Sequence, residues 1–237
     1  MKYLIPVSMA VLASSPTFAA ESGGWNGDIE FGYTSTSGNS DDSNLKARFD
    51  AKRDTGNWKN HAHLDATNSE SEGIRSSERY FGSYRLGYNF SDTQYVYGYG
   101  SYEDDRFSGY DYQSTVSVGY GQTLIDESNM KWSFEVGPGY RFAKVADDVA
   151  EDDEEDAILR AFTHYEWSFT ETATFFQDLS VEYGEDNTIS KSVTALKTKI
   201  SDGFALQLSY TIKNTKNAPE GKENTDTETA ITLVYAF

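Results

Sequence analysis

Residues 45–52 read Leu45-Lys46-Ala47-Arg48-Phe49-Asp50-Ala51-Lys52, a strict alternation of apolar and charged side chains. Successive side chains of a β-strand point to opposite faces, so this pattern predicts a strand with one apolar and one charged face. Similar alternation recurs to the end of the chain in stretches of about 10 to 13 residues, close to the length that a tilted strand needs to cross a bilayer. We count twelve such stretches. The pattern therefore predicts an all-β chain.

The connections between these stretches alternate in length. Every second one is short and rich in turn-forming residues: 54–57, 91–93, 126–129, 170–172 and 201–203. The intervening connections are mostly longer and more polar, for example 68–77, 143–156 and 214–224. Short turns on one side and long loops on the other are typical of outer-membrane barrels, in which the short turns are periplasmic.

Aromatic residues make up 15% of the chain and gather near the ends of the expected strands. Aromatic rings favour the lipid interface, so these positions predict two lipid-facing girdles. The set near the tight turns and termini is Trp25, Trp58, Phe90, Tyr95, Trp132, Trp167, Phe169, Phe175, Phe204 and Phe237. The set near the longer loops is Tyr33, Tyr80, Tyr110, Tyr140, Tyr183 and Tyr210.

Backbone polar groups cannot stay unpaired in hydrocarbon, so strands that cross a membrane must close into a ring. An even number of strands also places both termini on the periplasmic side. We therefore expect a single antiparallel up-and-down transmembrane β-barrel of twelve strands. The weak pattern of residues 188–200 leaves that count open by two.

The first residues carry a different signal. A positive start at Met1-Lys2 precedes an apolar run from Leu4 to Ala13, and small residues follow at positions 17 and 19, on either side of Phe18. This pattern is typical of a Sec signal peptide, so we expect residues 1–20 to be cleaved and residues 21–237 to form the barrel. An N-terminal membrane anchor is the alternative, although the run is shorter than the roughly 20 residues that a spanning helix needs. The chain has no cysteine, which excludes a lipoprotein and a disulfide framework.

The composition narrows the choice of partners. The chain carries 38 acidic and 20 basic residues, and a net charge of −18 argues against binding to nucleic acid. The expected partners are outer-membrane lipid and lipopolysaccharide. The oligomeric state stays open, because lipid and a second subunit would contact the same apolar face.

The last residues, Thr232-Leu233-Val234-Tyr235-Ala236-Phe237, look like the terminal strand that the bacterial barrel-assembly machinery recognises. Tyr235 and Phe237 are the candidate assembly signal, and the machinery is an expected partner during biogenesis.

A more specific resemblance, to a known family, rests on two further stretches and covers most of the chain. They are residues 25–33 with the following Ser37-Gly38-Asn39-Ser40, and residues 105–112 with the later Val118-Gly119-Tyr120-Gly121. On these residues the chain resembles the family of salt-induced outer-membrane proteins, which has no established activity. The resemblance implies a barrel in the outer membrane of a Gram-negative bacterium and carries over no catalytic residue.

Two constellations suggest metal ions. Eight of the ten residues at 147–156 are acidic, and dense carboxylates could collect Ca²⁺ or Mg²⁺, the weak candidates being Asp152, Asp153, Glu154, Glu155 and Asp156. The alternative is a solvated external loop. His61, His63 and Asp65 share one strand face and could hold a metal, but polar residues also routinely line a barrel lumen. We expect no cofactor.

The inward face of the predicted barrel carries both signs of charge. Asp111 belongs to this face by its phase, and the candidate lumen residues are Lys46, Arg48, Lys52, Arg79, Arg85, Glu135, Arg160 and Glu182. All three histidines share that face. No serine in the outward register of a neighbouring strand has a histidine beside it, so the sequence offers no serine–histidine pair for catalysis and we expect no enzyme. Two functions stay open. One is a narrow, porin-like passive channel for small polar or ionic solutes, and the other is a closed structural or adhesive barrel that responds to salt.

Overall fold

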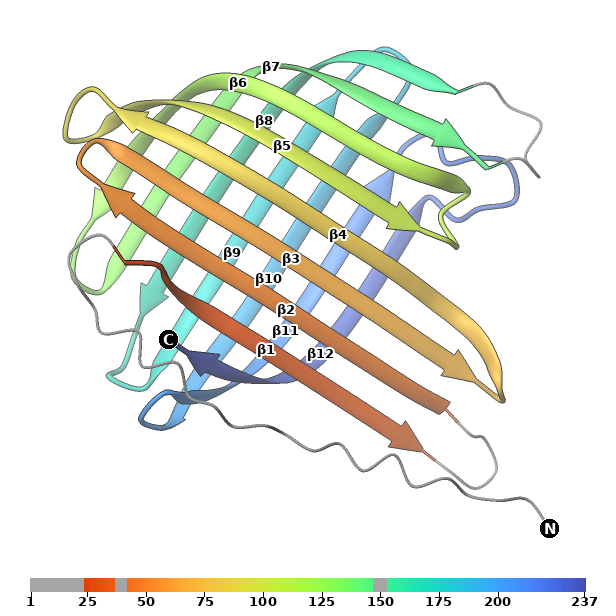
Figure 1. Ribbon diagram of the computed structural model, residues 1–237, viewed down its shortest axis with the longest axis horizontal. Coiled ribbons are helices and arrows are strands. Elements are labelled where there is room, and N and C mark those ends of the chain that lie inside the picture. Colours follow the sequence, from red (N-terminus) through yellow and green to blue (C-terminus); the bar gives the residue numbers. More distant parts are fainter. Residues whose placement is uncertain (1–23, 37–41, 147–152) are drawn as a thin grey trace.

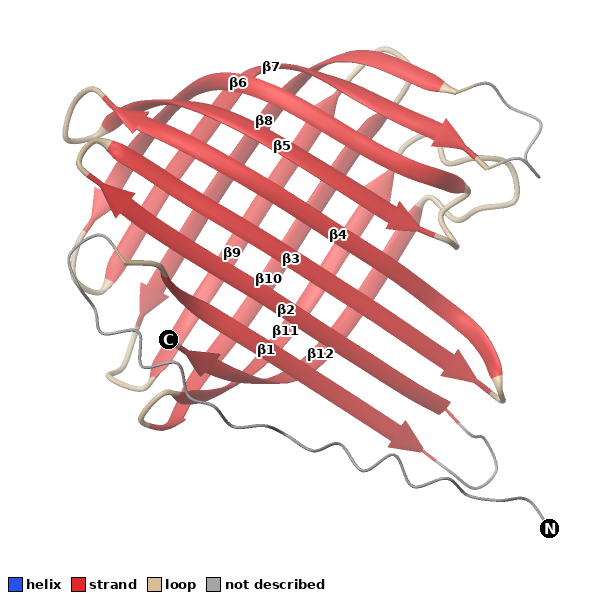
Figure 2. Ribbon diagram, in the orientation of Figure 1, coloured by secondary structure: helices blue, strands red, loops and turns tan. Residues whose placement is uncertain are grey.

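The computed structural model describes residues 24–36, 42–146 and 153–237. The predicted signal peptide, residues 1–20, lies outside the described residues. Twelve antiparallel strands form a closed barrel in which each strand pairs with the next and β1 pairs with β12, as Figures 1 and 2 show. The predicted fold and strand number are confirmed. The strands are β1 (Asn26–Thr36), β2 (Asp42–Thr55), β3 (Trp58–Ser71), β4 (Ile74–Asn89), β5 (Gln94–Asp105), β6 (Tyr110–Asp126), β7 (Met130–Val145), β8 (Glu154–Ser168), β9 (Ala173–Tyr183), β10 (Thr188–Ser201), β11 (Phe204–Thr215) and β12 (Thr225–Ala236).

The barrel is inverted relative to a water-soluble protein. Large apolar side chains such as Phe31, Leu64 and Ile231 are exposed on its outside, whereas charged side chains such as Lys46 and Glu135 are buried inside. In water, exposed apolar side chains and buried charges would both be unfavourable. Lipid around the barrel favours the exposed apolar side chains, and a polar lumen accommodates the charged ones. No helix among the described residues has the length and apolar character needed to cross a membrane.

The tight turns lie at one end of the barrel, together with the C-terminus (Figure 1). The connections at the other end differ from the prediction in three places. The predicted loop 68–77 does not exist, because β3 and β4 continue to a two-residue turn at Glu72-Gly73, where φ is 53° and 76°. Positive φ at both turn residues matches the twist of a hairpin, so the strands can pair up to the turn. The predicted loops 143–156 and 214–224 shorten to 146–153 and 216–224.

The lipid-facing girdles are present, with two exceptions. The side chains of Trp58, Trp132, Trp167 and Tyr183 are exposed on the outside, but Tyr95 and Tyr110 are only 6% and 3% exposed and point inward. In β6 the register shifts between Tyr110 and Tyr112, and this bulge reverses the phase of the strand end. For the same reason the prediction that Asp111 faces the lumen is wrong.

Candidate functional site

The candidate site is the lumen itself. All eight predicted lumen residues lie on its wall. Lys52 is near the end with the tight turns, where its Nζ is 3.9 Å from Asp50 Oδ1. The other seven belong to two ion-pair clusters, one on each side of the barrel.

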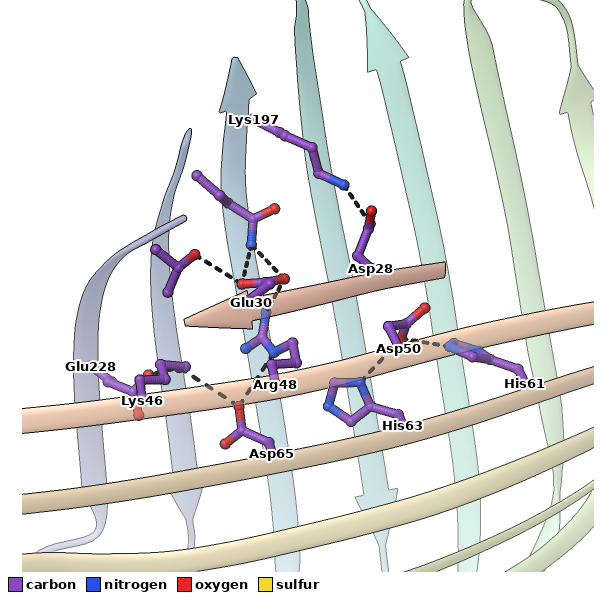
Figure 3. A network of polar contacts seen from close by, with 12 residues as sticks. Asp28, Glu30, Lys46, Arg48, Asp50, His61, His63, Asp65, Lys197 and Glu228 are labelled. Carbon is purple, nitrogen blue, oxygen red and sulfur yellow. Dashed lines mark hydrogen bonds and ion pairs between the residues drawn. The ribbon is translucent and has the colours of Figure 1, made fainter. Parts of the chain in front are cut away.

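The first cluster joins β12 to β4 across β1, β2 and β3. Figure 3 shows its members on β12, β1, β2 and β3. It consists of Glu30, Lys46, Arg48, Asp65, Arg79 and Glu228. Asp65 lies between two guanidinium groups, 3.3 Å from Arg48 Nε and 2.8 Å from Arg79 Nη2. Arg79 also reaches Glu228, with 3.2 Å between Nη2 and Oε2, and Lys46 pairs with the same carboxylate. Alternating signs in this cluster compensate the cost of removing so many charges from bulk water.

The second cluster lies on β4 to β9 and consists of Arg85, Glu135, Arg160 and Glu182. Arg85 pairs with Glu135, whose second oxygen is 3.5 Å from Arg160 Nη1. Arg160 Nε is 4.0 Å from Glu182 Oε1. Tyr99 supports this cluster, because the Arg160 guanidinium lies 3.9 Å from the centre of its ring.

The inward position of Tyr95 follows from the glycines of the neighbouring strand. A Cβ atom on Gly121 would lie 2.0 Å from the Tyr95 ring, and one on Gly119 would lie 2.8 Å from the Tyr97 ring. These glycines therefore leave the space that the tyrosines of β5 occupy. Tyr95 then donates a 3.2 Å hydrogen bond to Glu135 Oε1. A partner for the hydroxyl inside the barrel explains why the predicted lipid-facing position of Tyr95 is wrong.

Side chains from opposite walls meet inside the barrel. Strand β5 lies diametrically opposite β11, and β4 lies opposite β10. Lys213 on β11 pairs with Glu103 on β5, and Lys191 Nζ on β10 lies 5.0 Å from the centre of the Phe81 ring on β4. Glu103 and Lys213 are near the strand ends away from the tight turns, so the lumen is constricted in its outer half.

The described part of the acidic segment, residues 153–156 at the start of β8, does not form one metal site. Asp153 Oδ1 accepts a hydrogen bond from the backbone N–H of Val145, Glu154 accepts one from Tyr110, and the side chain of Glu155 is exposed. Asp156 is buried and accepts from the backbone N–H groups of residues 185–187. The described candidates therefore support different parts of the outer mouth, and Asp152 lies outside the described residues.

The histidines pair with carboxylates in the inner half of the lumen. His61 Nε2 and His63 Nδ1 lie 2.7 and 3.1 Å from the same oxygen of Asp50, whereas Asp65 turns to Arg48 (Figure 3). The three side chains share the inward face of β3, as predicted, but the two histidines pair with Asp50 and not with Asp65. His164 Nδ1 lies 2.5 Å from Asp178 Oδ1. No group of three or more His, Asp or Glu side chains in the described ranges is suited to hold a metal ion.

Comparison with known proteins decides the family. A family described as "Protein of unknown function, DUF481" matches residues 29–237. The chain belongs to the DUF481 family. The uncharacterized protein YdiY of Escherichia coli (strain K12) is 32% identical over 219 residues, which are 90% of this chain and 83% of that protein. Membership in a family of unknown function is thus confirmed, while the predicted link to salt stays a prediction.

One of two similar solved structures shows the fold of this DUF481 protein. A NanC porin has a TM-score of 0.54 and 11% identity, covering 88% of this chain and 98% of its own. A KdgM porin in complex with disordered oligogalacturonate has a TM-score of 0.47 and 10% identity, covering 89% and 99%. At such identities the first similarity shows the fold alone.

Sequence reasoning missed several charged residues of the DUF481 lumen. The missed residues are Glu103, Arg141, Lys191, Lys197 and Lys213. Three of the five lie on β10 and β11, where the phase of β10 was hard to read. The pairing of strands could have identified the lysines of β10 and β11. Antiparallel pairing places Lys191 opposite Lys213, so the side chains of both residues share the inward face.

Proposed function

We propose that this DUF481 protein is a narrow passive channel for small polar or ionic solutes in the outer membrane of a Gram-negative bacterium. The barrel fold, which it shares with a solved porin, supports this location. The apolar outside and the charged inside support a polar path through the lipid. The proposal assigns the protein no chemical reaction and no cofactor.

One observation carries the proposal: below the outer mouth, side chains and not a folded segment of chain cross the described part of the lumen. The constriction depends on Lys213 and Glu103, whose long side chains reach from opposite walls. Such a contact can separate when one side chain changes rotamer, so it narrows the path without sealing it permanently. Opposite charges at a constriction also create a transverse field, which favours polar and ionic solutes over apolar ones.

Single-channel conductance in a planar bilayer tests the proposal. The refolded protein is expected to give small discrete steps, and Lys213→Ala should enlarge them about twofold because it removes one wall of the constriction. Lys144→Ala is the matched control. It removes the same atoms from a lysine that pairs with Asp111 outside the lumen, at 2.6 Å, and should leave the steps unchanged.

A closed structural or adhesive barrel is the second candidate. The hydrogen bonds at the outer mouth favour it, because Asn187 and Arg141 are almost completely buried there. Under this function the wild type and Lys213→Ala would both be silent, although the folded form still migrates differently from the heated form on a gel. That result would rule out the channel.

The C-terminal end of the barrel and its outer surface each suggest a proposed partner. Phe237 stacks on Phe49 with 5.9 Å between ring centres, and Tyr235 packs against Phe204 at 5.2 Å, both at the end with the tight turns. An exposed aromatic terminus on the last strand suits recognition by the barrel-assembly machinery. Lipid and lipopolysaccharide are the proposed partners of the outer surface.

A further inference from the structure

The connection between β11 and β12, residues 216–224, lies across the outer mouth; we call it the outer lid. It contacts the turn between β5 and β6, although β5 and β11 are diametrically opposite. A Cβ atom on Gly109 of that turn would lie 3.0 Å from Pro219 Cβ and 3.1 Å from Lys222 Cγ. Pro219 is fully buried by this approach. Figure 1 shows both connections at the same end of the barrel.

The turn between β9 and β10 holds the outer lid from a third position, chiefly through the side chain of Asn187. Asn187, in the turn between β9 and β10, is 1% exposed. Its Nδ2 donates to Asn217 O at 2.7 Å and to the Tyr110 hydroxyl at 3.2 Å, and its Oδ1 accepts from Asn217 N at 3.0 Å. The side chain of Asn217 returns a 2.6 Å hydrogen bond to Asp186 O. These bonds connect the lid to the barrel wall.

The turn that carries Asn187 is itself fixed. The buried carboxylate of Asp156 accepts hydrogen bonds from the backbone N–H groups of residues 185–187 at 3.0, 3.2 and 3.3 Å. Arg141 binds both Asp156 Oδ2, at 3.2 Å, and Asn187 O, at 3.1 Å. Because the anchor is rigid, the contact between Asn187 and Asn217 is the place where the lid can part from the wall.

The space that remains under the lid is small, as expected when the outer mouth is closed. A cavity of about 40 Å³ remains there, lined by residues that include Gln113, Lys213, Lys222 and Asp226. That volume admits a few water molecules but no larger solute. Polar groups predominate in the lining of this cavity.

We propose that residues 216–224 form a lid that closes the outer mouth, with Asn187 as its latch. The control of passage rests on the proposed channel function. The movement of the lid does not, so the two can be tested separately.

Trypsin measures the movement. The lid contains Lys216 and Lys222, and the hydrogen bonds that hold it closed slow cleavage at both. In the refolded protein, Asn187→Ala should raise the cleavage rate at these two sites about tenfold, because it removes the latch's side-chain hydrogen bonds. Mass spectrometry identifies the sites, and the gel shift of the folded form confirms that the barrel is intact.

Asn214→Ala is the matched control. Asn214 bonds to Asn224 O and Thr225 Oγ1 within its own hairpin and does not reach another wall, so its loss should leave cleavage nearly unchanged. Tyr110→Phe is a milder second variant, which removes only the hydroxyl that accepts from Asn187 and should accelerate cleavage less. Equal rates in the wild type, Asn187→Ala and Tyr110→Phe would overturn the latch.

Conductance separates the lid from the channel. Asn187→Ala should be open for a larger fraction of time than the wild type. Faster cleavage with silence in every variant would support the mobile lid and contradict the channel function. Faster cleavage with wild-type conductance would overturn the claim that the lid closes the mouth.

Discussion

Glu30 links the first strand to the last two. Its carboxylate accepts hydrogen bonds from Gln207 on β11 at 3.0 Å and from Thr232 on β12 at 3.0 Å, and it lies 3.4 Å from Arg48 on β2. These partners belong to strands on both sides of the line where β1 meets β12. One buried charge therefore supports the closure of the ring from inside.

Replacing Glu30 with Gln should weaken this closure. The substitution keeps the shape but loses the charge and turns one acceptor into a donor that faces Gln207 Nε2 and Thr232. A hydrogen bond to a charged group contributes about 2 kcal/mol, so the free energy of unfolding should fall by roughly that amount. Urea unfolding of the refolded barrel, followed by its gel shift, measures it. Glu223→Gln in the exposed lid is the control, and equal midpoints for both variants would contradict the role of Glu30.

The wall formed by β5 and β6 shows how a strand fits its neighbours. Gly119 and Gly121 leave room on β6, and the inward tyrosines of β5 lie in that room. The filled space brings the Tyr95 hydroxyl to Glu135 and the Tyr95 ring to Arg85, whose guanidinium lies 4.9 Å from the ring centre. The glycines thus position the second ion-pair cluster indirectly.

Gly121→Ala tests this arrangement. The new methyl group would overlap the Tyr95 ring, so Tyr95 must move, and overpacking of this kind costs about 1–3 kcal/mol. Gly98→Ala is the control, because a Cβ atom on that β5 glycine would meet nothing within 4 Å. Thermal unfolding of the two variants should differ, with Gly121→Ala melting at the lower temperature. Identical melting would mean that the tyrosine ring adapts freely.

Single strands also show how far a sequence predicts this fold. The alternation in β2 and β4 identifies their faces correctly, because lipid outside and charge inside differ sharply. In β10 two outward positions in the middle of the strand are polar: Ser192 and Thr194 lie opposite Leu179 and Gln177, and Gln177 hydrogen-bonds to both. When outward residues are polar as well, the alternation of the sequence does not show which face of the strand points into the lumen. The bulge in β6 and the contacts between opposite walls depend on register and three-dimensional closure, which local alternation does not contain.

All four tryptophans of the molecule lie near the end with the tight turns. Trp25, Trp58, Trp132 and Trp167 are between 40% and 47% exposed, on a surface that the apolar pattern assigns to lipid. In a bilayer they should occupy one shallow depth. Brominated lipids should therefore quench their fluorescence more strongly when bromine is near the headgroup than near the chain end.

Leu64→Trp in the otherwise tryptophan-free background provides the contrast. Leu64 lies near the middle of β3 and is 57% exposed, so a tryptophan there should show the reverse order of quenching. Quenching of the native tryptophans by a water-soluble quencher alone would contradict the membrane orientation of the barrel.

The ring is not equally strong all the way round. Strands β1 and β12 are paired over four residues, whereas β1 and β2 are paired over eleven. A load applied sideways to the wall is shared by all the backbone hydrogen bonds at each junction, so each bond at the short junction carries the most. Under lateral tension the barrel would separate there first, and β12 would unzip from β1 before any other pair of strands parts.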